Sequence, residues 1–126
     1  MAASRSIPIN TDINRIFYEY LSLGRSFFEA CLSKVNGKKI KLNNKEVLVL
    51  SRLMYYNYII KNGSILSTEI RKNIMKELNI DKYSLNNNIA NLRKKKALND
   101  DKIALFLVIN PDEDIYRLTF QFNIYG

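Results

Sequence analysis

The chain has 126 residues, a formal net charge of +8 and 47% hydrophobic residues. This length fits one domain with one hydrophobic core, and the positive charge favours a polyanionic partner such as nucleic acid. The chain contains no His, which excludes His-containing triads, Cys-His sites and His-based zinc sites within it. We therefore expect a protein that is not an enzyme and that needs no metal ion and no cofactor.

The single cysteine, Cys31, excludes a disulfide within the chain. Its helical spacing from Phe27, Phe28 and Leu32 favours a buried core thiol over a reactive one. No apolar run approaches the roughly 18 residues of a membrane-spanning helix, and the N-terminus lacks the pattern of a signal peptide. We expect a cytoplasmic protein without a membrane partner, located in the host cytoplasm if a phage encodes it.

The N-terminal part predicts an extended arm followed by a long amphipathic helix. Residues 1–10 form the arm, because Pro8 disfavours helix at the residue before it. The helix covers residues 11–37, and its apolar positions recur with a period close to 3.6 residues. These positions are Ile13, Ile16, Phe17, Tyr20, Leu21, Phe27, Phe28, Cys31, Leu32 and Val35. Gly24 costs about 1 kcal/mol relative to Ala inside a helix, so a kink or a break into two helices there is the alternative.

A second helix is expected after a basic turn, with Asn43 or Asn44 as its N-cap and Gly63 as its stop. Its broad apolar face predicts a central place in the core. The apolar positions are Val47, Leu48, Leu50, Leu53, Met54, Tyr58 and Ile59. A short strand is expected next, at residues 64–66.

A third and a fourth helix follow, separated by a short turn at residues 79–82. The third opens at Ser67 or Thr68, and the fourth is capped by Ser84 and ends in a basic run at residues 93–96. The inward positions are Ile70, Ile74, Met75 and Leu78 in the third helix, and Leu85, Ile89 and Leu92 in the fourth.

Two strands are expected at the C-terminus, at residues 102–110 and 115–124, because both stretches are rich in β-branched, aliphatic and aromatic residues. A turn with Asp112, Glu113 and Asp114 joins them into a β-hairpin. The whole chain, residues 1–126, is therefore expected to be a single α+β domain that is mainly helical.

The order of helices, short turn and hairpin over residues 43–124 resembles a winged helix-turn-helix. Residues 42–50 (LNNKEVLVL) are similar to the opening helix of replication-initiator and phage replisome-organiser domains. Residues 67–98 are similar to the support helix, turn and recognition helix of that superfamily. The resemblance covers about two thirds of the chain. It implies a C-terminal hairpin wing and a transcriptional regulator or replication-initiation factor of phage or mobile-element origin. The N-terminal helix is then an extra element outside the winged unit.

The resemblance also implies that the fourth helix lies in the major groove of double-stranded DNA. The candidate base-reading residues, opposite the inward face, are Asn86, Asn87 and Asn91, with Lys94 beside them. An Asn amide can pair bidentately with adenine. The candidate phosphate contacts are Lys82, Tyr83, Ser84, Arg93, Lys95 and Lys96. The alternative is compositional: an Asn run in an Asn-rich chain, and a solvated Lys run that complements the helix dipole.

The distribution of charge along the chain argues against DNA contact by the predicted hairpin wing. Residues 1–66 carry a net charge of +6 and residues 67–96 carry +5, whereas residues 97–126 carry −3. Acidic groups at the hairpin turn repel phosphates, so the wing points away from the duplex or contacts a basic protein, or DNA is not the ligand. The alternative function is therefore a structural or adaptor protein, such as a phage assembly component, that uses this fold to bind another protein.

Two further alternatives remain open. The N-terminal helix packs on its own domain, which we favour, or pairs with a second copy to form a homodimer that binds two half-sites. Single-stranded nucleic acid binding by stacking needs Tyr116, Phe120 and Phe122 exposed on one strand face. The same period-2 spacing fits a strand packed on the helices, which we favour.

Overall fold

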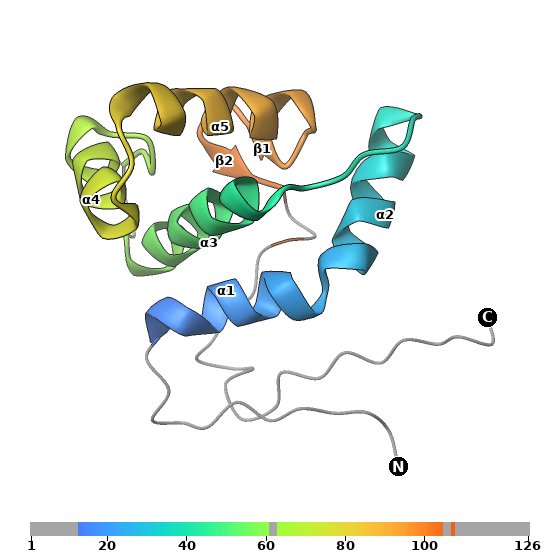
Figure 1. The fold of residues 1–126 in the computed structure, drawn as a ribbon, viewed down its shortest axis with the longest axis horizontal. Coiled ribbons are helices and arrows are strands. Elements are labelled where there is room, and N and C mark those ends of the chain that lie inside the picture. The colour runs from blue at the N-terminus through green and yellow to red at the C-terminus, as the bar shows by residue number, and fades with distance from the viewer. Residues whose placement is uncertain (1–12, 61–62, 105–106, 108–126) are drawn as a thin grey trace, which may run out of the picture.

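The computed structural model describes residues 13–60, 63–104 and 107. These residues form five helices and a two-stranded antiparallel sheet, so the fold is mainly helical and of the expected α+β class (Figure 1). Within these ranges, no helix combines the length and the apolar character needed to cross a membrane. The arm at residues 1–10 lies outside the described residues.

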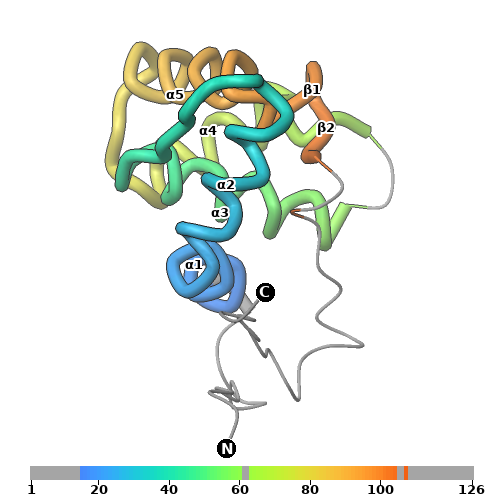
Figure 2. The backbone as a smooth tube through the Cα atoms, turned by 90° about the vertical axis from the view of Figure 1, so that its right-hand side faces the viewer, coloured from blue at the N-terminus to red at the C-terminus, as the bar shows by residue number. Residues whose placement is uncertain are grey.

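The long N-terminal helix is broken at Gly24 into α1 (Ile13–Leu23) and α2 (Arg25–Asn36). Gly24 has a φ of −96° and a ψ of 12°, and this ψ is far from the helical value of about −42°. The Gly24 N–H still donates to the Tyr20 carbonyl at 3.0 Å, and the Phe28 N–H donates to the Gly24 carbonyl at 2.9 Å. The chain therefore bends with its backbone groups satisfied. Figures 1 and 2 show α2 rising steeply from α1.

The buried side of α1 and α2 is narrower than the sequence pattern predicts. Its buried residues are Ile16, Phe17, Leu21, Phe28 and Leu32. Phe27 and Val35 are each 51% exposed, and Cys31 is partly exposed, so the prediction of a buried core thiol is wrong. After the bend, α2 directs Phe28 and Leu32 into the core. Residues one position earlier are rotated by about 100° toward solvent.

Helix α3 (Asn44–Ile59) lies at the centre and packs against α1, α4 and α5 (Figure 1). A capping box confirms Asn43 as its N-cap: the Glu46 N–H donates to Asn43 Oδ1 at 2.8 Å, and the Asn43 N–H donates to Glu46 Oε1 at 2.9 Å. Leu48 and Ile59, expected on the apolar face, are exposed, and Val49 is buried instead. The remaining core positions of the helix are Val47, Leu50, Leu53, Met54 and Tyr56.

Residues 64–66 form a turn, so the short strand expected there is wrong. The Ser64 hydroxyl accepts the Leu66 N–H at 3.0 Å, and this local bond satisfies the backbone without a partner strand. Helix α4 (Thr68–Leu78) then begins after Ser67, whose hydroxyl accepts the Ile70 N–H at 3.3 Å. This confirms a helix start at Ser67 and Thr68.

Helix α5 (Lys82–Lys94) begins two residues before the expected cap. Asp81 is the N-cap, because its Oδ1 accepts the Ser84 N–H at 2.7 Å. The prediction that Ser84 caps the helix is wrong, since Ser84 already lies in the first turn. A carboxylate at this position also complements the positive end of the helix dipole.

Strands β1 (Leu98–Asn99) and β2 (Lys102–Ile103) pair antiparallel, with Leu98 opposite Ile103. Both of these residues are buried and close the core below α5. Asp100, with a φ of 56°, makes the tight turn between the strands. The expected strand at residues 102–110 is confirmed only in part: Lys102 and Ile103 form β2 and pair with the segment before them, whereas Ala104 and Leu107 are not in a strand. The expected strand at residues 115–124 and the acidic hairpin turn lie outside the described residues, as do Tyr116, Phe120 and Phe122.

Candidate functional site

Helices α4 and α5 are consecutive helices joined by a short turn at residues 79–81 (Figure 1). Asn79 adopts the left-handed conformation with a φ of 53°, and the next N–H, of Ile80, donates to the Met75 carbonyl at 3.0 Å. The Asn79 N–H donates to the Lys76 carbonyl, which completes a Schellman motif. The turn is therefore closed by its own backbone, and it sets the direction in which α5 leaves α4.

The inner face of α5 is anchored to the core. Leu85, Ile89 and Leu92 are buried, as predicted. Asn88 is also buried, and its side-chain amide donates to the Ser84 carbonyl at 2.8 Å. The sequence pattern missed this residue, because an Asn whose amide bonds back to the preceding turn can fill a core position. These buried side chains fix which face of α5 meets the core and which face meets solvent.

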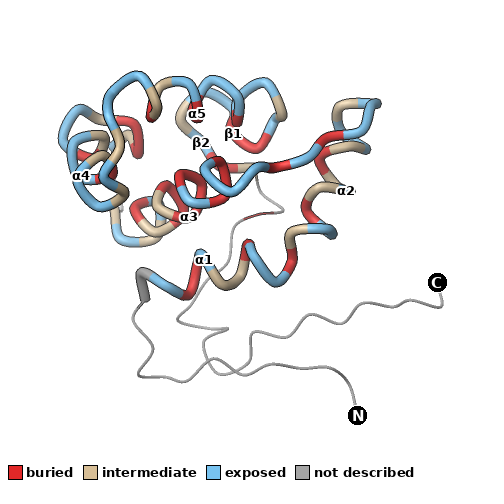
Figure 3. The backbone as a smooth tube through the Cα atoms, in the orientation of Figure 1, coloured by how far each residue is buried: buried red, intermediate tan, exposed pale blue. Residues whose placement is uncertain are grey.

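The outer face of α5 is polar and basic. Its exposed residues are Lys82, Tyr83, Asn87, Ala90, Asn91, Arg93 and Lys94. Figure 3 shows exposed residues along the outer side of this helix. Tyr83, which is 80% exposed, lies in one row with Asn87 and Lys94 at helical spacing. No Asp or Glu occurs within α5, so this row has no negative neighbour on its own helix.

Asn86, a candidate base-reading residue, is partly buried and already engaged. Its Oδ1 accepts a hydrogen bond from Arg71 Nη1 at 2.8 Å. Bidentate pairing with adenine needs both the oxygen and the nitrogen of the amide, so Arg71 competes for half of that interaction. Asn87 and Asn91, in contrast, are exposed on the outer face.

Lys95, a candidate phosphate contact, joins the end of α5 to the start of α3. Its Nζ donates to Glu46 Oε1 and to the Lys41 carbonyl, each at 2.6 Å. Glu46 is 1% exposed, and its Oε1 accepts both the capping bond from the Asn43 N–H and the bond from Lys95 Nζ. The Lys95 carbonyl accepts Asn36 Nδ2 at 2.8 Å. The sequence predicted a phosphate contact for this lysine, with a solvated run as the alternative, and the structural role follows only from its buried partner Glu46.

The other candidate phosphate contacts lie around the two ends of α5. Lys82 and Tyr83 are exposed in the first turn, where Ser84 is partly buried. At the far end, Arg93 is exposed, and its Nε donates to the Asp100 carbonyl at 3.1 Å. Lys96 is exposed with a φ of 65° and lies in the connection between α5 and β1. The structure thus brings four cations to the outer side and ends of α5, namely Lys82, Arg93, Lys94 and Lys96.

Among the metal-ligating and titratable side chains in the part of the chain that the structure describes, Tyr56 has a perturbed pKa. No group of three or more His, Cys, Asp or Glu side chains there can hold a metal ion. Burial, together with a hydrogen bond to Glu77, raises the pKa of Tyr56 to about 12. Tyr56 and Glu77 join α3 to α4 and lie outside the outer face of α5, so this perturbed group is structural.

Comparisons with protein-family models, with curated proteins and with solved structures find no match for this chain. Interpretation of the site therefore depends on the geometry and charge of α4 and α5.

Proposed function

We propose that the protein binds double-stranded DNA through α5 and acts as a transcriptional regulator or replication-initiation factor without enzymatic activity. The observation that supports this most directly is the outer face of α5, which is basic, polar and free of carboxylates on a helix anchored along its inner face. In this proposal α3, α4, α5 and the β1–β2 pair form a winged helix-turn-helix. Their order and the short turn between α4 and α5 support that assignment.

The dimensions of α5 fit the major groove. Its 13 residues span roughly 20 Å, and a helix of about 10 to 12 Å in diameter enters a groove about 12 Å wide. In the proposed complex Asn87 contacts a base edge, and Ala90 is small enough for close approach. Lys94 lies on the same row and contacts a phosphate or a guanine.

The internal contacts of α5 narrow the proposed interface. Lys95 and Asn86 are bonded within the protein, so we assign them to holding α5 in place. The proposed phosphate contacts are then Lys82, Arg93 and Lys96, at the two ends of the helix. Arg93 uses only Nε for its bond to the Asp100 carbonyl, so the other N–H donors of its guanidinium remain for a phosphate. Phosphate contacts at both ends would position the helix, and the residues between them would supply sequence discrimination.

Binding of the purified protein to a random double-stranded DNA pool tests this proposal. We would measure anisotropy at about 50 and 200 mM salt and sequence the bound fraction, because phosphate contacts make affinity fall steeply with salt. Enrichment of a short site is the expected result. Absence of binding at the lower salt would overturn the proposal.

Asn87→Ala tests the base-reading role of the outer row. We expect a loss of affinity of about 5- to 100-fold for the enriched site and a smaller loss for unrelated DNA, because a good bidentate pair contributes about 1 to 3 kcal/mol of discrimination. Asn57→Ala is the matched control, since Asn57 is an exposed Asn on α3. Equal losses on every DNA sequence would refute base reading by Asn87.

Lys94→Gln tests the electrostatic contribution. We expect it to reduce the slope of log affinity against log salt by about 1 if Lys94 contacts a phosphate. Arg15→Gln is the charge-matched control, because Arg15 is exposed on α1, which lies on the opposite side of α3 from α5 in Figure 1. Equal slope changes in both variants would indicate attraction by total charge alone.

A row of exposed apolar side chains on α2 favours a second candidate function, association with another protein chain. Phe27 and Val35 are each 51% exposed, with the partly exposed Cys31 midway between them at helical spacing. A second copy of this chain suits the DNA-binding proposal, since helix-turn-helix proteins commonly bind as two-fold dimers. Sedimentation equilibrium should then show a dimer that Phe27→Ser weakens. A monomer at all concentrations would exclude this dimer.

A further inference from the structure

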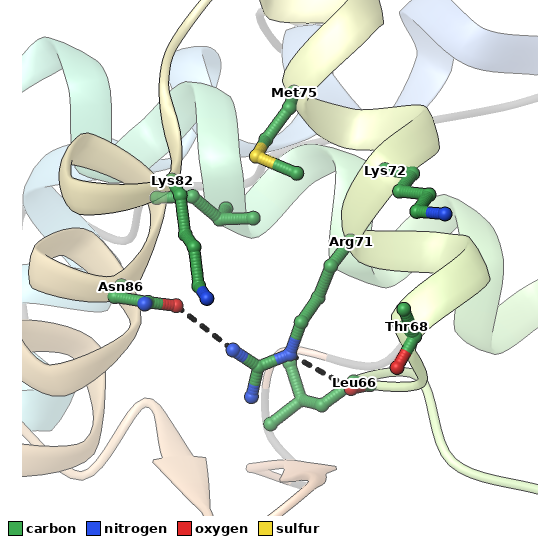
Figure 4. Close-up of a pocket in the computed structure, with 8 residues that line it drawn as sticks. Leu66, Thr68, Arg71, Lys72, Met75, Lys82 and Asn86 are labelled. Atoms are coloured by element: carbon green, nitrogen blue, oxygen red, sulfur yellow. Dashed lines mark hydrogen bonds between the residues drawn. The ribbon is translucent and has the colours of Figure 1, made fainter.

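A cavity of about 470 Å³ lies between α4 and α5 (Figure 4). It opens on the flank of α5 that faces α4, beside the outer row described above. Its volume is within the range of about 300 to 1,000 Å³ that is typical of small-molecule sites. Neither the helix-turn-helix geometry nor the proposed contacts of Asn87 and Lys94 account for it.

The charges around the cavity are all positive. Arg71, Lys72 and Lys82 line it, and no carboxylate does. None of these three side chains forms an ion pair with any residue in the described ranges. Figure 4 shows the ends of Arg71 and Lys82 directed toward one another across the space, whereas Lys72 points away at the rim. Two converging cations repel each other, and an anion between them would remove that repulsion.

Arg71 is fixed in position before any ligand arrives. Its Nε donates to the Leu66 carbonyl at 2.8 Å, and its Nη1 donates to Asn86 Oδ1 at 2.8 Å. A guanidinium has five N–H donors, so the rest of this planar group remains available to an oxyanion. Little side-chain entropy would be lost on binding, because the two existing bonds already order the group.

The remaining walls of the cavity are mostly apolar. Leu66 and Leu85 are buried residues whose side chains reach it, and Met75 is partly buried and packed against the core. Figure 4 shows the Met75 side chain extending into the space between the two helices. A bare inorganic ion would leave these walls in contact with water. An organic anion would cover them and gain the free energy of apolar burial.

We propose that this cavity is a binding site for a small organic anion, whose carboxylate or phosphate lies between Arg71 and Lys82 and whose apolar body contacts Leu66, Met75 and Leu85. The two anion types share the same recognition chemistry, which is charge-assisted hydrogen bonding to a guanidinium and an ammonium. The site shares Lys82 with the proposed DNA interface, but anion binding is measured without DNA, so the two proposals can fail separately.

Titration of the ¹⁵N-labelled full chain, followed by amide chemical shifts, tests the proposal. The probes are hexyl phosphate and hexanoate, with inorganic phosphate and 1-hexanol as controls for the charged and apolar halves. We expect saturable shifts around the cavity with at least one of the two organic anions, and binding at least about fivefold weaker with both controls. Inorganic phosphate binding as tightly as hexyl phosphate would overturn the role of the apolar walls. Shifts spread over the whole basic surface would overturn the site itself.

Lys82→Gln and Lys76→Gln form the matched pair of variants. Both lysines are exposed, so both variants are expected to fold, but only Lys82 lines the cavity, while Lys76 lies in the last turn of α4. We expect Lys82→Gln to raise the Kd of the organic anion by at least about fivefold and Lys76→Gln to change it by less than about twofold. Equal effects in the two variants would show attraction by net charge and would overturn the proposal.

Discussion

Replacement of Lys95 by Ala is expected to destabilise the fold, because Lys95 is the ion-pair partner of a buried carboxylate. The variant loses the bonds from Nζ to Glu46 Oε1 and to the Lys41 carbonyl, each 2.6 Å long. Glu46, which is 1% exposed, would keep only the Asn43 N–H as a described donor to its carboxylate. The buried negative charge would then lack its counter-charge.

The expected size of this effect follows from the burial of the pair. Removing one partner of a buried ion pair costs about 3 to 5 kcal/mol. The Lys95 side chain is 24% exposed, so water can reach the vacated position, and we expect the lower end, about 3 kcal/mol. For a chain of this size, that corresponds to a fall in Tm of roughly 10 °C.

Urea unfolding of four proteins measures the effect: wild type, Lys95→Ala, Glu46→Gln and the double variant. The double variant should be more stable than the sum of the single losses predicts, by about 1 to 2 kcal/mol, because a neutral amide at position 46 needs no counter-charge. Lys94→Ala is the control, since Lys94 is the exposed neighbour and its loss should stay within about 0.5 kcal/mol. A loss below about 1 kcal/mol for Lys95→Ala, or strict additivity, would refute the reasoning.

Two further predictions concern Tyr56 and the start of α5. The pKa of Tyr56 is raised to about 12 from an ordinary value of 10.0, so the folded state holds this proton more tightly than the unfolded state. The resulting stabilisation is complete below pH 10 and is lost as pH rises toward 12. The stability difference between wild type and Tyr56→Phe, measured by denaturant unfolding, should therefore change over that interval, and a constant difference would contradict the assignment. Asp81→Ala should cost about 1 kcal/mol through loss of the N-cap, whereas Ser84→Ala should cost less, and the reverse order of midpoints in urea would return the cap to Ser84.

Local signals in the sequence were sufficient to predict most of the helices. Asn43 and Ser67 cap as expected because a side-chain oxygen can satisfy an N–H of the first turn without any help from the rest of the chain. The buried positions of α5 were equally predictable, since Leu85, Ile89 and Leu92 repeat at the helical period. Such features depend on residues three or four positions apart.

The wrong predictions concern positions whose burial or pairing depends on how the chain turns in space. The bend at Gly24 changed which side of α2 meets the core, so Cys31 and Phe27 moved toward solvent although their spacing fits an apolar face. The expected strand at residues 64–66 became a turn, because no strand in the described part of the chain pairs with it. Apolar content is visible in the sequence, but the partner that buries it is not.

By itself, the sequence determined the helical content, the basic charge of the α5 segment and the absence of His chemistry, because composition and short-range spacing depend only on residues near one another in the chain. The tertiary structure decided which cations and amides are free to meet a ligand. Lys95 is paired with Glu46 and Asn86 with Arg71, across 49 and 15 positions of sequence. Such pairings depend on the packing of α3, α4 and α5, which brings distant polar groups to within hydrogen-bond distance in a partly buried setting.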